Sequence, residues 1–152
     1  MAKKFEIALP ANEVGKRVRA ILGVPDVVLT DEVISSQTFI KKTELYINRQ
    51  IKDYLEYFTE EVDYDLLKVS AMYYISYLLC VGMDARLPKQ MENLSTKTIL
   101  QNISWDVKAL EMLEKAQESL SDFLSEYDID EVDYSMTFAD LSDEIEYPEA
   151  NV

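Results

Sequence analysis

Carboxylates are the side chains of this sequence whose number and spacing could support chemistry. Four of them lie between residues 60 and 65, and a carboxylate pair can transfer protons or hold Mg²⁺. A second run, residues 128–133, begins like a calcium-binding loop. That loop needs glycine at its sixth position and glutamate at its twelfth, where this chain has Asp133 and Ala139. We therefore expect no metal site, and we expect the first group to stabilise the start of a helix.

The residue types that most enzymes use are nearly absent. The chain has no histidine, one cysteine and three glycines. Ser-His-Asp and Cys-His catalysis, histidine metal sites and an internal disulfide are thereby excluded. Gly15, Gly23 and Gly82 stand too far apart to form a phosphate-binding loop. We expect a protein without enzymatic activity and without a cofactor.

The charge is strongly acidic and unevenly distributed. Acids outnumber bases 29 to 15, and residues 116–152 hold twelve acids and no base after Lys115. Such a segment repels nucleic acid. Near the start of the chain the sign is opposite, and we predict that Lys16, Arg17 and Arg19 contact the acidic segment of a neighbouring copy. The alternative is two solvated surfaces, since exposed ion pairs contribute little.

Hydrophobic periodicity predicts a mainly α fold, a small bundle of about four helices around one central apolar helix. The predicted helices are 13–22, 30–58, 64–83 and 105–127. We assign residues 1–127 to a helical domain and residues 128–152 to an acidic, extended C-terminal arm.

Capping residues and apolar stripes give these helices their expected ends and faces. Asn12, Thr30 and Ser104 are candidate N-caps, and Gly23 followed by Pro25 ends the first helix. The helix over 64–83 is apolar nearly all round, so we expect protein on most of its sides, with Cys80 in the core, rather than a membrane span. Trp105 is a predicted core anchor. On the last helix, the predicted buried face is Leu110, Leu113, Leu120, Leu124 and Tyr127.

Two further segments carry expectations about contacts. Residues 84–103 lose helical periodicity, and a short strand is possible over residues 96–100. In the arm, Tyr134, Met136 and Phe138 alternate with polar residues, which is typical of a strand. A lone strand cannot stabilise itself. It either folds back on the strand near Thr98 or adds to another chain, and the three apolar residues are candidate inter-subunit contacts.

The order of helices resembles that of a known family. The relevant stretches are LTDEVISSQTFIKKTELYINRQI (29–51), DLLKVSAMYYISYLLC (65–80) and STKTILQNISWDVKALEMLEKAQESL (95–120). The order begins with a proline turn and an acidic opening to a long helix. A nearly all-apolar helix with small residues follows, and a Ser-Trp-Asp step then leads into a final helix. This pattern, over about residues 22–120, resembles the head–tail adaptor (connector, head-completion) proteins of long-tailed double-stranded-DNA bacteriophages.

The resemblance implies a structural protein of the virion neck that is assembled in the host cytoplasm. In that family a ring, typically of twelve copies, binds below the portal, extends the DNA channel and docks the tail or a stopper. The implied partners are other copies of the chain, the portal protein and a tail-side stopper or tail-completion protein, with genomic DNA only as transiting cargo and no membrane.

Two other functions compete with this one. An acidic helical interaction module, such as a DNA mimic or an inhibitor of a host protein, would use the acidic segment. A nucleic-acid-binding regulator would use Lys16, Arg17 and Arg19, but the remaining charge opposes it.

Overall fold

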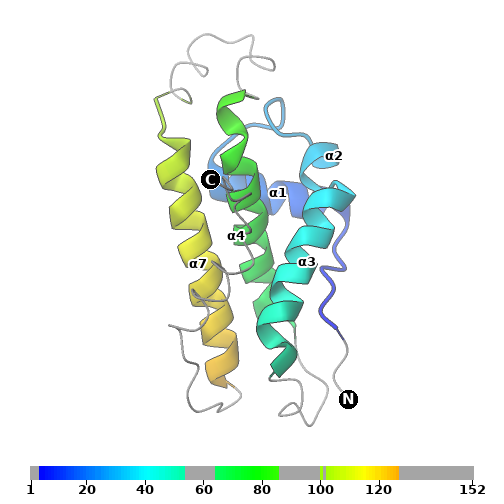
Figure 1. Cartoon of the computed structure of the whole chain (residues 1–152). Coiled ribbons are helices and arrows are strands. Elements are labelled where there is room, and N and C mark those ends of the chain that lie inside the picture. Colours follow the sequence, from blue (N-terminus) through cyan, green and yellow to red (C-terminus); the bar gives the residue numbers. More distant parts are fainter. Residues whose placement is uncertain (1–3, 54–63, 86–99, 101, 127–152) are drawn as a thin grey trace, which may run out of the picture.

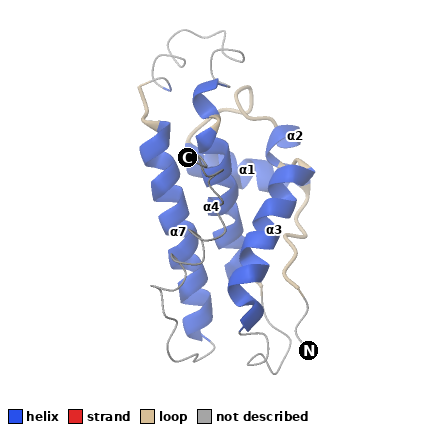
Figure 2. Ribbon diagram, viewed as in Figure 1, coloured by secondary structure: helices blue, strands red, loops and turns tan. Residues whose placement is uncertain are grey.

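A computed structural model describes residues 4–53, 64–85, 100 and 102–126 of the chain. The helices in these ranges are α1 (Ala11–Leu22), α2 (Asp31–Ile34), α3 (Gln37–Ile51), α4 (Asp65–Val81) and α7 (Trp105–Glu126). Every regular element in this part of the chain is a helix, as Figure 2 shows. The predicted mainly α bundle is therefore confirmed. None of these helices combines the length and the apolar content that a bilayer span requires.

The central position belongs to α4. In Figure 1, α7 runs antiparallel to α4 on one side, α3 lies on the other side, and α1 lies behind. The packing of α4 against α7 is the most extensive contact between helices in the described residues. Inside it, the Ser70 hydroxyl donates a hydrogen bond to the Ala116 carbonyl at 2.7 Å, which satisfies a buried polar side chain.

Large apolar side chains from most described elements meet in one core. On α4, Ile75 and Leu79 are fully buried, and Phe123 of α7 joins them. Trp105 is 1% exposed and its Nε1 donates to the Leu100 carbonyl at 3.1 Å, so its predicted role as a core anchor is confirmed. Cys80 is buried, as predicted.

The ends of α1 and α2 combine two confirmed predictions with one that was wrong. Gly23 adopts φ 68° and donates its N–H to the Arg19 carbonyl, which closes α1 with the left-handed cap that glycine allows. Thr30 caps α2 by accepting a hydrogen bond from the Val33 N–H. Asn12 is not a cap, because α1 begins two residues earlier than predicted, with Pro10 at its N-cap position and the Pro10 carbonyl accepting from the Glu13 N–H.

The long helix predicted from Thr30 is interrupted, which corrects the sequence-based boundary. The four-residue α2 ends at Ile34 with Ser35 as its C-cap, and α3 begins after Ser36. The Ser35 hydroxyl donates to the Asp31 carbonyl, and Ser36 has an extended backbone with ψ 144°. Serine side chains offer the backbone alternative hydrogen bonds, so two in succession favour a break that apolar periodicity does not reveal. Residues 54–58 of the predicted helix lie outside the described residues.

On α7, the predicted buried face was wrong in part. Leu120 and Leu124 are buried, but Leu110 is 68% exposed. The core is instead reached by smaller or more flexible residues, among them Ala109, Met112 and Ala116. Small side chains let α7 approach α4 closely, so the buried stripe is centred away from the leucines. Residue 127, the predicted strand residues 96–99 and the arm 128–152 lie outside the described residues.

An N-terminal segment is fastened to α3 by one side chain. The Phe5 N–H donates to Asn48 Oδ1 at 2.8 Å, and Asn48 Nδ2 donates to the Phe5 carbonyl at 3.0 Å. The amide thus pairs with both backbone groups of Phe5, as a neighbouring strand would. Phe5 and Ile7 are almost fully buried, so this segment belongs to the core rather than to a solvated tail.

Candidate functional site

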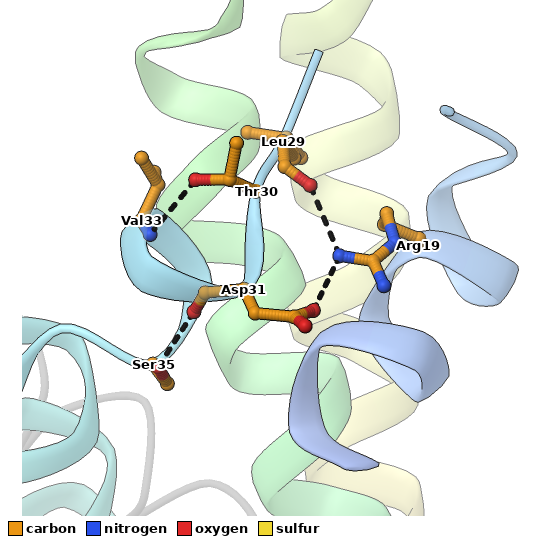
Figure 3. Close-up of polar contacts among 6 residues, drawn as sticks. All are labelled: Arg19, Leu29, Thr30, Asp31, Val33 and Ser35. Carbon is orange, nitrogen blue, oxygen red and sulfur yellow. Dashed lines mark hydrogen bonds and ion pairs between the residues drawn. The ribbon is translucent and has the colours of Figure 1, made fainter. Parts of the chain in front are cut away.

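Arg19, one of the three predicted basic contact residues, is committed to contacts inside the chain. Its Nη1 donates to Asp31 Oδ1 at 2.6 Å and to the Leu29 carbonyl at 3.1 Å (Figure 3). The Arg19 side chain is only 18% exposed. Arg19 therefore joins α1 to the start of α2. Because its guanidinium is mostly buried and paired with Asp31, it is less accessible to another chain than Lys16 or Arg17.

Gly15 makes this ion pair possible. A Cβ at position 15 would lie 1.9 Å from Asp31 Oδ1 and 3.0 Å from Arg19 Nη1. The carboxylate of Asp31 therefore occupies the space that any other residue would fill. The α1–α2 lock, which we define as Gly15, Arg19 and Asp31, is a structural feature that depends on all three residues.

Lys16 and Arg17, the other two predicted contact residues, are exposed on α1. Arg17 Nε lies 3.6 Å from Glu13 Oε2, and both side chains are about half exposed. An exposed pair one helical turn apart contributes a few tenths of a kcal/mol and can be exchanged for another partner. The predicted apolar contacts, Tyr134, Met136 and Phe138, lie outside the described residues.

One side of α4 carries an exposed apolar surface that sequence reasoning missed. Leu66, Val69, Tyr73, Tyr77 and Val81 follow one another at spacings of three and four residues, so they share one side of the helix. We call these five residues the α4 strip. Leu66, Val69 and Val81 are 39%, 43% and 65% exposed, and the two tyrosines are half-buried.

Buried residues interrupt the strip, because Ser70 and Cys80 fall within its arc and the Ser70 hydroxyl is bonded to α7. With about 100° between successive residues, the centre of the strip is half a turn away from Ile75. In Figure 1, α7, α3 and α1 surround α4, and α7 reaches the strip itself, because Lys115 Nζ contacts the Tyr73 ring. An aligned row of apolar side chains on a helix is typical of a contact surface. The spacing of residues 66, 69, 73, 77 and 81 was a usable signal, but it is masked in a helix that is apolar all round.

Tyrosines fill the junction between α3 and the strip. The rings of Tyr46 and Tyr74 stack with centroids 4.1 Å apart and planes within 4°, and Tyr74 contacts Tyr77 at 5.5 Å. Burial, and then the neighbouring Tyr74, raise the pKa of Tyr46 far above its usual range. Within the described residues, the buried Tyr46 hydroxyl has no hydrogen-bond partner.

Cations stand on both flanks of the strip. On α7, Lys115 Nζ lies 5.8 Å from the centre of the Tyr73 ring, within the range of a cation–π contact, and 3.3 Å from Glu111. On α3, the positive charge of Arg49 acts on Tyr74, whose pKa it lowers against the larger opposing effects of burial and Tyr77. The charge of Lys115 is paired with that of Glu111, so the α7 edge of the strip carries no net positive charge.

A pocket of about 360 Å³ opens where the N-terminal segment meets α1 and the α2–α3 break. It is lined by Ile7, Ala8, Leu9, Ala11, Val14, Ser35, Gln37 and Ile40. Ala8 has φ 48°, an uncommon value for a residue with a side chain, and it marks the bend that separates the segment from α1. No ionisable side chain lines this pocket, so it offers no acid–base chemistry.

Within the described ranges, no three acidic or thiol side chains come close enough to hold a metal ion. Asp65, the one residue of the predicted carboxylate group that these ranges include, lies 3.0 Å from Lys68 Nζ on its own helix. The exposed surfaces of the described residues include Lys16 and Arg17 on α1, Val107 and Leu110 on α7, and Leu66, Val69 and Val81 on α4. In comparisons with known proteins, no family model, no curated protein and no solved structure matches the chain.

Proposed function

We propose that the protein is a structural component of a bacteriophage virion, a head–tail connector that forms a ring below the portal. The ring extends the DNA channel and docks the tail or a stopper. Part of the helix order supports this proposal: a central apolar helix is followed by a final helix that begins at Trp105, whereas the long helix that the resemblance implies is broken after Ile34.

One observation carries the proposal. A ring of identical copies needs two unlike surfaces on each copy, because one face meets a different face of the neighbour. The body offers such surfaces on separate helices: exposed Lys16 and Arg17 on α1, and exposed Val107 and Leu110 on α7. The core is buried within the single chain, so these surfaces are available for assembly rather than needed for folding.

Charge is consistent with the role in DNA passage. The formal net charge of −14 and the twelve acids after Lys115 keep DNA from adhering to a channel wall that carries them. The segment also supplies anions for the basic pair on the α1 helix of the next copy.

Co-expression with the portal protein of the same genome tests this function. We expect electron microscopy to show a ring of this chain on the portal, and we expect Lys16→Glu with Arg17→Glu to prevent it. The matched control is Lys41→Glu with Lys42→Glu, which reverses two adjacent exposed charges on α3. Failure to bind the portal, together with absence of the chain from purified particles, would reject the proposal.

The acidic segment favours one alternative, a helical module that imitates DNA or inhibits a host protein. Such a module would bind a basic host protein at a salt-sensitive interface and would be absent from particles. Mass spectrometry of purified particles therefore separates the two functions.

A further inference from the structure

The hydrogen bonds and the ring contact that hold the N-terminal segment, residues 4–9, come from α3 and α4. In the described part of the chain, the backbone of this segment makes two hydrogen bonds, and both join Phe5 to the Asn48 amide of α3. The Phe5 ring meets the Tyr64 ring edge-on, with centroids 5.9 Å apart, at the start of α4. Phe5 and Ile7 are buried. Because α1, into which the segment leads, supplies none of these bonds, a second copy of the chain can present the same binding site to it.

The link between this segment and α1 is short and strained. Ala8 has φ 48°, in the left-handed region that a residue with a Cβ rarely adopts. Pro10 is the N-cap residue of α1, and a residue before proline, here Leu9, favours an extended backbone. The pocket of about 360 Å³ has Ala8 and Leu9 in its wall, so the bend is incompletely packed. A short hinge under strain favours the exchange of a terminal element between copies.

Exchange would relieve the strain and keep the anchoring contacts. If the segment leaves α1 in a straight line, Ala8 takes an extended backbone, and the three hinge residues 8–10 then span about 10 Å. Phe5 and Ile7 enter the same site on the neighbour, because identical copies have identical sites. The balance between the closed form and the exchanged form is therefore set by the hinge and by the protein concentration.

We propose that copies of this chain exchange residues 4–7, so that Phe5 of one copy is bound by Asn48 and Tyr64 of another. In the free protein two copies exchange reciprocally and form a dimer, which leaves no segment and no site unoccupied. The exchange does not depend on the proposed ring, and it stands whether or not the chain is a virion protein.

Isotope-filtered NMR of the full-length chain tests the exchange. Equal amounts of labelled and unlabelled chain are unfolded together, refolded and separated by size exclusion. The protein concentration is about 1 mM, comparable to the effective concentration of a tethered segment at its own site. We expect a dimer fraction in which nuclear Overhauser effects join Phe5 of one chain to Asn48 and Tyr64 of the other. In the monomer fraction the same contacts should lie within one chain.

Ala8→Gly probes the hinge, because glycine adopts a positive φ without the cost that alanine bears. The substitution relaxes the closed form, so we expect the association constant of the dimer to fall about tenfold or more, since each dimer contains two hinges. Ala11→Gly is the matched control. Ala11 is also exposed, but it is the first residue of α1 and has no positive φ, so its replacement should leave dimerisation nearly unchanged.

Absence of a dimer at this concentration would overturn the proposal. A dimer in which every contact between Phe5 and Asn48 lies within one chain would overturn it as well, because such a dimer uses a different surface. Equal dimerisation of Ala8→Gly and the parent chain would also reject it, because strain at Ala8 would then not drive the exchange.

Discussion

The two sides of α4 have nearly the same composition and opposite environments. Ile75 and Leu79 on the inner side are fully buried, whereas Val69 and Val81 on the outer side are 43% and 65% exposed. Burial is therefore decided by which helices pack against α4, and not by the apolar character of the side chain. A helix that is apolar all round can hold both the core of a domain and a surface for a further contact.

The largest expected effect separates these two sides. Ile75→Asp should unfold the domain, because an unpaired charge in the core costs several kcal/mol, against a total stability of about 5–15 kcal/mol. Val69→Asp should change the stability by less than about 1 kcal/mol, because its side chain reaches water. Thermal unfolding followed by circular dichroism measures both variants. A cooperative transition of Ile75→Asp near that of the parent chain would show that the inner side of α4 is not the core.

A second variant probes α1, which packs against α4 and is held to α2 by the lock. Gly15→Ala should cost about 1 kcal/mol net, because the new Cβ displaces the carboxylate of Asp31 from Arg19, while alanine gains up to about 1 kcal/mol of helix propensity over glycine. Urea denaturation measures this cost. In an Asp31→Ala background the displaced carboxylate is absent, so the same substitution should cost much less. Equal costs in the two backgrounds would show that crowding by Asp31 is not the cause.

Helix positions were predictable because they depend on local signals. Apolar spacing predicted the positions of α1, α4 and α7. Gly23 and Thr30 indicated helix ends, and Trp105 was correctly predicted to be buried. The break at Ser35 and Ser36 was missed because the apolar pattern continues across it. The exposure of Leu110 was missed because both a leucine stripe and a stripe of smaller residues are compatible with helical periodicity, and only the close approach to α4 selects between them.

The candidate site was less predictable, because local sequence patterns do not show which charged residues of different helices form ion pairs. Arg19 was interpreted as a contact for another chain, and Asp31 only as part of the acidic opening to a long helix. Their ion pair links residues on either side of a proline turn. The Asp31 carboxylate has room in this position because residue 15 is a glycine and has no Cβ. The α4 strip was missed because apolar residues occur on nearly every side of that helix, so the sequence does not show which of them are exposed.

The stability of the domain at alkaline pH should depend on whether a thiol on α4 is buried or exposed. Burial raises the pKa of the Cys80 thiol from its ordinary value of 9.0 to about 11. The unfolded chain therefore loses this proton first, and the stability that the neutral thiol contributes is present below pH 9 and lost as the pH rises towards 11. Two pKa units set the upper limit of this loss at about 3 kcal/mol.

Urea midpoints at about pH 8 and about pH 10.5 measure this loss. Cys80→Ala should lose less stability over the interval than the parent chain. A thiol placed on the outer side, Val81→Cys in the Cys80→Ala background, should not restore the steeper loss, because an exposed thiol has a similar pKa in both states. An identical pH dependence for all three chains would show that burial of Cys80 has no energetic consequence.

The smallest effect concerns the junction between the buried α3–α4 packing and the strip. The Tyr46 hydroxyl is buried and has no hydrogen-bond partner within the described residues, so the native state bears the cost of removing it from water. Tyr46→Phe keeps the ring that stacks on Tyr74 and removes only this hydroxyl. We expect the free energy of unfolding to stay constant or to rise by about 0.5–1 kcal/mol, in contrast to Tyr46→Ala, which also removes the stacked ring and should cost about 3–5 kcal/mol. Calorimetry of the three chains provides the comparison.

Because the pKa of Tyr46 is raised in the folded state, its hydroxyl also penalises folding above the unfolded pKa of about 10, so the advantage of Tyr46→Phe should grow at higher pH. A loss of more than about 1 kcal/mol in Tyr46→Phe would mean that the hydroxyl is hydrogen-bonded in solution, by water or by a carboxylate from outside the described residues.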